Sequence, residues 1–120
     1  MCALNMMKYL QTFIHETKER LTVLNKSLVA LEKSPNNVEL IQTINRESHN
    51  IKGAAGMMGF KNIQDIAHRI EDMFIKISQG NTAFNLEIMN DVFKDLDSIT
   101  IIMNELTNQP ISDENPVFSP

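Results

Sequence analysis

Residues 48–60 decide the fold of this chain, and they read Ser48-His49-Asn50-Ile51-Lys52-Gly53-Ala54-Ala55-Gly56-Met57-Met58-Gly59-Phe60. The spacing of Ile51, Ala55 and Met58 places these three residues on one face of an amphipathic helix. His49 does not share that face, and two of the glycines occupy interior helix positions, where each costs about 1 kcal/mol relative to alanine. A helix that breaks local rules in this way is typical of a functional site.

Apolar residues at steps of three and four recur along the rest of the chain and predict four helices. We expect these helices at about 6–32, 37–59, 61–79 and 85–107. In the last of them the predicted inward stripe comprises Leu86, Met89, Phe93, Leu96, Thr100 and Met103. No segment shows a sustained period of two, so strands are not expected. Long helices with short connections predict an all-α fold, namely an antiparallel up-down four-helix bundle.

The length of 120 residues fits one domain with a sizeable core. We expect the bundle to occupy residues 1–107 and to be monomeric. Residues 108–120 contain Pro110 and Pro116 and lose the helical periodicity, so we interpret them as a tail or linker, with a short fifth helix as the alternative.

Composition excludes several classes of protein. The net charge of −4 and the absence of a basic stripe argue against nucleic-acid binding. No apolar run approaches the ~20 residues that cross a bilayer, so no membrane partner is expected. Cys2 is the only cysteine, which favours a reducing compartment, and the N-terminus lacks the pattern of a secretory signal. These features together predict a cytoplasmic protein.

His49 is the first candidate for chemistry. On a helical wheel the apolar stripe centres about 130° away from it, so its imidazole points largely to solvent. Arg46, Lys52, Gly53 and Gly56 lie on the same outer face, where bare backbone lets a large partner approach closely. A neutral imidazole with one ring nitrogen held as a donor is a good nucleophile. The alternative is an ordinary surface histidine beside glycines that relieve helix crowding.

The next helix offers a group that could orient this ring. His68 and Glu71 are three residues apart and therefore lie on one side of that helix. Glu71 occupies a boundary position from which a carboxylate can reach an adjacent helix. Lys52 and Arg46 would supply positive charge to a phosphoryl group on the ring. The spacing leaves open whether the two helices pack with these edges together.

The run from His49 to Phe60, followed by His68-Arg69-Ile70-Glu71, resembles the histidine-phosphotransfer (HPt) domain at the N-terminus of the chemotaxis histidine kinase CheA. The resemblance implies that His49 accepts the γ-phosphoryl of ATP from a kinase catalytic domain and passes it to an aspartate of a response regulator receiver domain. It also implies that His68, Glu71 and Lys52 form a hydrogen-bonding network around the phosphorylated histidine. Members of the family often carry a fifth helix.

This chain contains neither a phosphate-binding loop with the Gly-Lys-Ser/Thr ending nor the glycine loop of protein kinases. We therefore expect no cofactor in this domain, with ATP and Mg²⁺ supplied by the kinase domain and the response regulator. The domain by itself would be a phosphoryl carrier, and its parent a protein histidine kinase. Arg46, Gly53, Gly56 and Met57 form the predicted docking surface for these partners.

Three alternatives stay open at this point. The chain could be a free-standing HPt protein of a phosphorelay. It could be a metal-binding bundle that uses His49, His68 and Glu71, although di-metal bundles use Glu-x-x-His from two helices and this chain offers one reversed His-x-x-Glu. It could also be a structural or adaptor bundle, which would not require His49, Lys52 and two glycines on one outward face.

Overall fold

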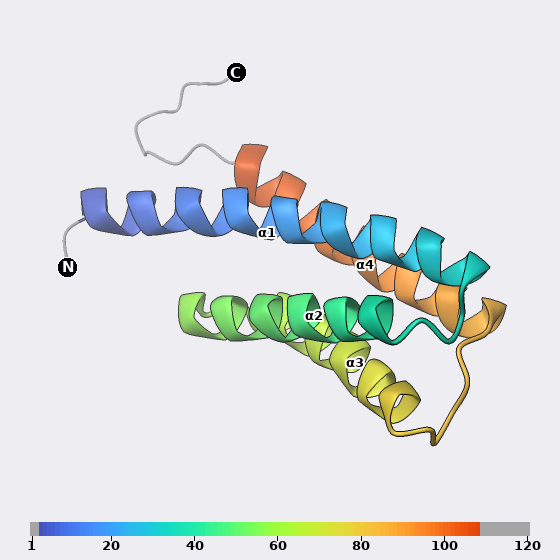
Figure 1. Ribbon diagram of the computed structural model, residues 1–120. Coiled ribbons are helices and arrows are strands. Elements are labelled where there is room, and N and C mark those ends of the chain that lie inside the picture. Colours follow the sequence, from blue (N-terminus) through green and yellow to red (C-terminus); the bar gives the residue numbers. More distant parts are fainter. Residues whose placement is uncertain (1–2, 109–120) are drawn as a thin grey trace.

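The computed structural model describes residues 3–108, which form four α-helices joined by short connections (Figure 1). The helices are α1 (Ala3–Lys33), α2 (Val38–Met58), α3 (Lys61–Ser78) and α4 (Leu86–Asn108). The four predicted helices are confirmed, and α4 extends one residue beyond the predicted domain boundary at 107. The rest of the predicted tail, residues 109–120, and the possible fifth helix lie outside the described residues.

The helices are arranged as an antiparallel up-down bundle, as predicted. α1 packs against α2 and α4, and α3 packs against the same two helices, so the four form a closed ring. The contact between α2 and α3 is the most extensive of the four, and that between α3 and α4 the least. None of the helices within residues 3–108 is long and apolar enough to cross a membrane.

The turn between α2 and α3 places these two helices side by side. Gly59 ends α2 in the left-handed region at φ 84°, which glycine adopts without strain. The backbone N–H of Phe60 then donates to the carbonyl of Ala55 at 2.9 Å and closes the turn. At the other end of α2, the side chain of Asn37 accepts a hydrogen bond from the Leu40 N–H and caps the helix. The sequence predicted both ends of α2 correctly.

One apolar core runs through the ring of helices, and α4 faces it differently from the prediction. Leu86 is 60% exposed, whereas Ile88, Val92 and Ile99, which the predicted stripe omitted, are buried. Apolar residues cover two adjacent stripes of α4, so a spacing of three and four residues was compatible with either stripe facing the core. Leu96 and Met103 belong to both stripes and are buried as predicted, whereas Phe93 is half-buried at the edge of the core.

Candidate functional site

His49 of α2 and Glu71 of α3 meet at the outer edge of the seam between these helices. His49 Nδ1 lies 2.6 Å from Glu71 Oε2, and the histidine side chain is 62% exposed. Because a carboxylate only accepts hydrogen bonds, the proton of the neutral imidazole lies on Nδ1. Nε2 then keeps its lone pair, and it has no hydrogen-bond partner among the described residues. The structure brings together the nucleophile and the orienting carboxylate that the sequence proposed.

Glu71 is a buried carboxylate with two cationic or donor partners. Its side chain is 10% exposed, and its Oε1 lies 2.7 Å from the ammonium Nζ of Lys52. Burial by itself raises the pKa of Glu71, but the ammonium of Lys52 and the hydrogen bond with His49 outweigh burial and bring the pKa below its ordinary value. Glu71 therefore stays ionised while it holds the imidazole. The sequence placed Glu71 at the rim of the core, and the structure places it deeper.

Lys52 forms an ion pair with the carboxylate of Glu71. Its side chain is half-buried, and its charge is neutralised by the carboxylate at 2.7 Å. Oε1 of Glu71 is buried and accepts no hydrogen bond of good geometry from the described residues. Among these residues, the ammonium of Lys52 is its ion-pair partner. The phosphoryl-stabilising role expected for Lys52 stays a prediction.

A shallow basin adjoins the histidine on its N-terminal side. It is lined by Gln42, Asn45, Arg46, His49 and Glu71. Gln42 lies seven residues before His49 and was not among the predicted site residues. The helical spacing of i−3, i−4 and i−7 would have been the signal, because these positions share a face of α2.

Arg46 has a carboxylate neighbour that α1 also contacts. Its Nε lies 3.7 Å from Oε2 of Glu47, while Oε1 of Glu47 accepts a hydrogen bond from Arg20 of α1 at 2.9 Å. Glu47 is largely buried, and the Arg46 side chain is 60% exposed. The sequence did not single out the Arg20–Glu47 pair, because nothing in the spacing of either helix predicts which residues of α1 and α2 meet.

His68 does not join this cluster directly. It lies one turn before Glu71 on α3, and its Nε2 is 3.4 Å from Oδ1 of Asp72 on the same helix. Within residues 3–108 the structure contains no hydrogen bond between His68 and His49. The network role expected for His68 stays a prediction, and in this conformation the residue belongs to an exposed pair beside the site.

Packing among residues 3–108 does not require the two glycines near His49. A Cβ added to Gly53 would meet nothing within 4 Å. A Cβ added to Gly56 would come within 2.7 Å of Nε2 of Gln64, which is the end of a flexible side chain that can move. One helical turn beyond Gly53, Met57 is 90% exposed. The outer face of α2 is therefore open and partly apolar, as a docking surface would be.

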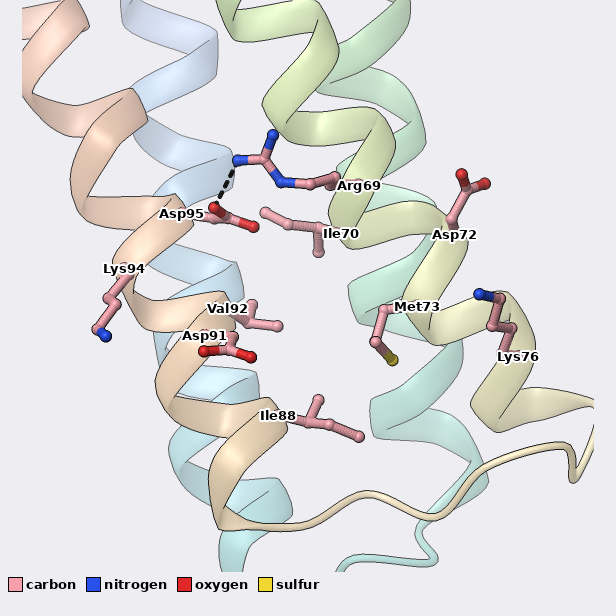
Figure 2. A pocket seen from close by; sticks show the side chains of 10 residues that line it. All are labelled: Arg69, Ile70, Asp72, Met73, Lys76, Ile88, Asp91, Val92, Lys94 and Asp95. Carbon is pink, nitrogen blue, oxygen red and sulfur yellow. Dashed lines mark hydrogen bonds and ion pairs between the residues drawn. The ribbon is translucent and has the colours of Figure 1, made fainter.

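A second concave region lies between α3 and α4, on another side of the bundle (Figure 2). Its groove has a volume of about 480 Å³, and apolar side chains such as Ile70 and Val92 point into it. Arg69 of α3 reaches across one end to Asp95 of α4, with 2.8 Å between Nη2 and Oδ1. None of the predicted site residues lines this groove. No cluster of three or more His, Cys, Asp or Glu in the described part of the chain could hold a metal ion.

Comparison with known proteins gives consistent matches. The model of the Hpt domain family matches residues 8–107. Chemotaxis protein CheA of Halobacterium salinarum is 37% identical over 98 residues, which are 82% of this chain and 15% of that protein. CheA of Bacillus subtilis is 29% identical over 103 residues, which are 86% of this chain and 15% of that protein.

Among solved structures, the CheA phosphotransferase domain from Thermotoga maritima superposes with a TM-score of 0.82 at 34% identity. The superposition covers 85% of this chain and 97% of that domain. This chain thus matches nearly all of an isolated phosphotransferase domain, but only 15% of the length of the two CheA proteins above.

Proposed function

This chain belongs to the Hpt domain family, and we propose that it carries a phosphoryl group on Nε2 of His49 in two-component chemotaxis signalling. One observation supports His49 as the phosphorylated residue. Its Nδ1 is 2.6 Å from the buried carboxylate of Glu71, which leaves Nε2 as the exposed nucleophile. An imidazole oriented in this way follows the general logic of a nucleophile held by an acceptor.

In the proposed reaction, the Nε2 lone pair attacks the γ-phosphorus of ATP. The bond from that phosphorus to the β,γ-bridging oxygen breaks, and ADP leaves with the electron pair. Nδ1 keeps its proton, so the ring becomes cationic and the carboxylate of Glu71 balances its charge. In the second transfer, a carboxylate oxygen of an aspartate attacks the phosphorus, and the electron pair of the P–N bond returns to Nε2. The neutral imidazole is then restored.

The partners that we propose supply what this chain lacks. Phosphoryl transfer depends on positioning and on charge neutralisation by Mg²⁺ and nucleotide-binding loops. We assign ATP and Mg²⁺ to a kinase catalytic domain, and the acceptor aspartate with its Mg²⁺ to a response regulator receiver domain. The open face of Gly53, Gly56 and exposed Met57 supports docking of such partners, with Arg46 at its N-terminal edge.

The parent that we propose is a cytoplasmic histidine kinase similar to CheA. The matched relatives support this proposal, since the chain corresponds to 15% of the length of the two CheA proteins compared. A full reading frame that encodes a dimerisation domain and an ATP-binding domain after this bundle is the expected finding. A reading frame that ends after the bundle would assign the chain to free-standing phosphorelay proteins.

The assignment of His49 is tested by labelling. Incubation with a CheA-type kinase core and radiolabelled ATP should give an acid-labile, base-stable phosphate on the chain, and His49→Gln should carry none. His15→Gln is the matched control, because His15 is an exposed histidine of α1 that pairs with Glu19 of its own helix. Full labelling of the control is expected. Retention of the label in His49→Gln would overturn the assignment.

A further inference from the structure

The direction in which the His49 side chain leaves α2 decides where a phosphoryl group on its ring lies. Side chains of an α-helix lean toward the helix N-terminus and cover the preceding turn. That turn carries Asn45 and Arg46, and Gln42 lies one turn earlier. These three residues line the basin next to the ring. A group on Nε2 is therefore placed on the side of Asn45 and Arg46, and away from Gly53.

The basin is rich in hydrogen-bond donors. Arg46 presents a planar guanidinium, which matches the oxygens of a phosphoryl group, and Asn45 and Gln42 each carry an amide NH₂. Arg46 is three residues before His49, a spacing at which helical side chains are neighbours. The carboxylate of Glu71, which also lines the basin, is occupied by His49 and Lys52.

Lys52 and Arg46 are the two cations beside His49 on α2, and Arg46 is the one available to bind phosphoryl oxygens. Lys52 is held 2.7 Å from Oε1 of Glu71, in a half-buried position. Arg46 is 60% exposed, and its one ion-pair contact with the described residues is long, at 3.7 Å from Nε to Glu47. Glu47 is in turn hydrogen-bonded by Arg20 of α1, which competes with Arg46 for this carboxylate. The two terminal nitrogens of Arg46 can therefore turn toward the histidine.

We infer that Arg46, with the amides of Asn45 and Gln42, binds the phosphoryl oxygens on Nε2 of His49, and that Lys52 is a positioning residue acting through Glu71. This inference rests on the proposed function and deepens it. It separates two tasks among the basic residues: Lys52 keeps the carboxylate ionised and in place, and Arg46 neutralises the charge that arrives on the ring.

The test uses phosphoramidate, a small donor that phosphorylates without a partner domain. Nε2 attacks its phosphorus, the P–N bond of the donor breaks, and ammonia leaves with the electron pair. We expect Arg46→Gln to slow formation of phosphohistidine and to shorten its lifetime, each by about fivefold to tenfold, because a charged hydrogen bond at a partly exposed site is lost. Asn45→Ala and Gln42→Ala should each cost about twofold, since neutral hydrogen bonds are weaker.

A second readout separates phosphoryl binding from ring positioning. The ¹⁵N signals of the unphosphorylated His49 ring report which nitrogen carries the proton. They should be unchanged in Arg46→Gln and should shift in Lys52→Gln, because loss of the ammonium alters Glu71. Arg69→Gln is the charge-matched control: Arg69 is 63% exposed and pairs with Asp95 on the α4 side of α3. It should leave rate, lifetime and ring signals as in the wild type.

Each remaining outcome overturns the inference. If Arg46→Gln and Arg69→Gln behave alike with phosphoramidate, Arg46 does not bind the phosphoryl group. If Arg46→Gln is impaired only when the kinase core is the donor, its role is docking. If Lys52→Gln shortens the lifetime and leaves the ring signals unmoved, Lys52 binds the phosphoryl group itself. A wild-type chain that takes no phosphoryl group on His49 would overturn the proposed function as well, which distinguishes the two failures.

Discussion

Two of the carboxylates that bridge helices in this bundle, Glu71 and Asp95, have different surroundings. Glu71 joins α3 to α2 through His49 and Lys52 at 2.6 and 2.7 Å, and Asp95 joins α4 to α3 through Arg69 at 2.8 Å. The contact lengths are similar, but the burial is not. The side chains of Glu71 and Lys52 are 10% and 27% exposed, whereas those of Asp95 and Arg69 are 21% and 63% exposed. Contact length therefore does not distinguish the proposed functional cluster from the pair at the other seam.

The packing of the two seams explains the difference in burial. α2 and α3 share the most extensive contact of the bundle, are joined by the tight turn at Gly59, and bring the small residues Ala55 and Ala67 into the core. α3 and α4 share the least extensive contact, and a groove opens between them (Figure 2). A carboxylate at the first seam is shielded from water and can orient a neighbour. Asp95 at the second seam is more exposed to water.

The largest expected difference between the seams is catalytic. Glu71→Ala should slow phosphorylation of His49 by the kinase core and ATP by about 100-fold, because an unheld imidazole loses its orientation and tautomer. The fold should survive, since His49 and Lys52 are solvent-accessible and can be hydrated after the carboxylate is removed. Initial rates of label incorporation measure the first effect, and circular dichroism measures the second.

Asp95→Ala is the matched control for this comparison. It removes a helix-bridging carboxylate of the same charge from the α3–α4 seam, in a groove that none of the predicted site residues lines. Its phosphorylation rate should equal that of the wild type. Equal rates for Glu71→Ala and wild type would show that the 2.6 Å contact does not orient the nucleophile.

The fold was predictable because each helix carries its own periodic signal and its own ends. Gly59 and Asn37 mark the ends of α2 by local chemistry alone, and the structure confirms both. The register of α4 was not predictable in the same way. Leu86 and Ile88 both begin acceptable apolar stripes, and only packing against α1 and α3 selects the one that contains Ile88.

The site shows the same division between local and tertiary information. Exposure of His49 follows from its place on one helix, so the sequence predicts it. The partner of Lys52 depends on how two helices pack, so the sequence could not predict its 2.7 Å contact with Glu71. For the same reason the Arg20–Glu47 contact between α1 and α2 had no sequence signal.

A smaller effect should appear in the pH dependence of stability. The pKa of Glu71 is lowered in the folded state from the ordinary value of 4.5, against the opposing effect of burial. The folded state therefore binds the proton of Glu71 less readily than the unfolded state does. This contribution to the free energy of unfolding is present above the ordinary pKa and is lost as the pH falls through the lowered pKa.

Denaturant unfolding of wild type and Glu71→Gln measures this contribution from about pH 7 to about pH 3. The stability advantage of the wild type should hold above the ordinary pKa of 4.5 and shrink below it. The glutamine variant is the suitable reference because it keeps the shape of the side chain and does not titrate. A difference that grows as the pH falls would mean that burial outweighs the contacts with Lys52 and His49.

The smallest effect is expected at the other seam. Arg69 donates to Asp95 at 2.8 Å, and this contact raises the pKa of Arg69 further above its ordinary value. Yet the guanidinium is largely exposed, so water and salt screen the pair. A double-mutant cycle of Arg69→Gln and Asp95→Asn should give a coupling energy of about 0.2–1 kcal/mol, and it should fall with added salt.

The corresponding cycle of Lys52→Gln and Glu71→Gln should give a larger coupling that salt changes less, because its carboxylate is buried. Equal couplings at the two seams would mean that burial does not separate them, and the orienting power of Glu71 would then need another cause.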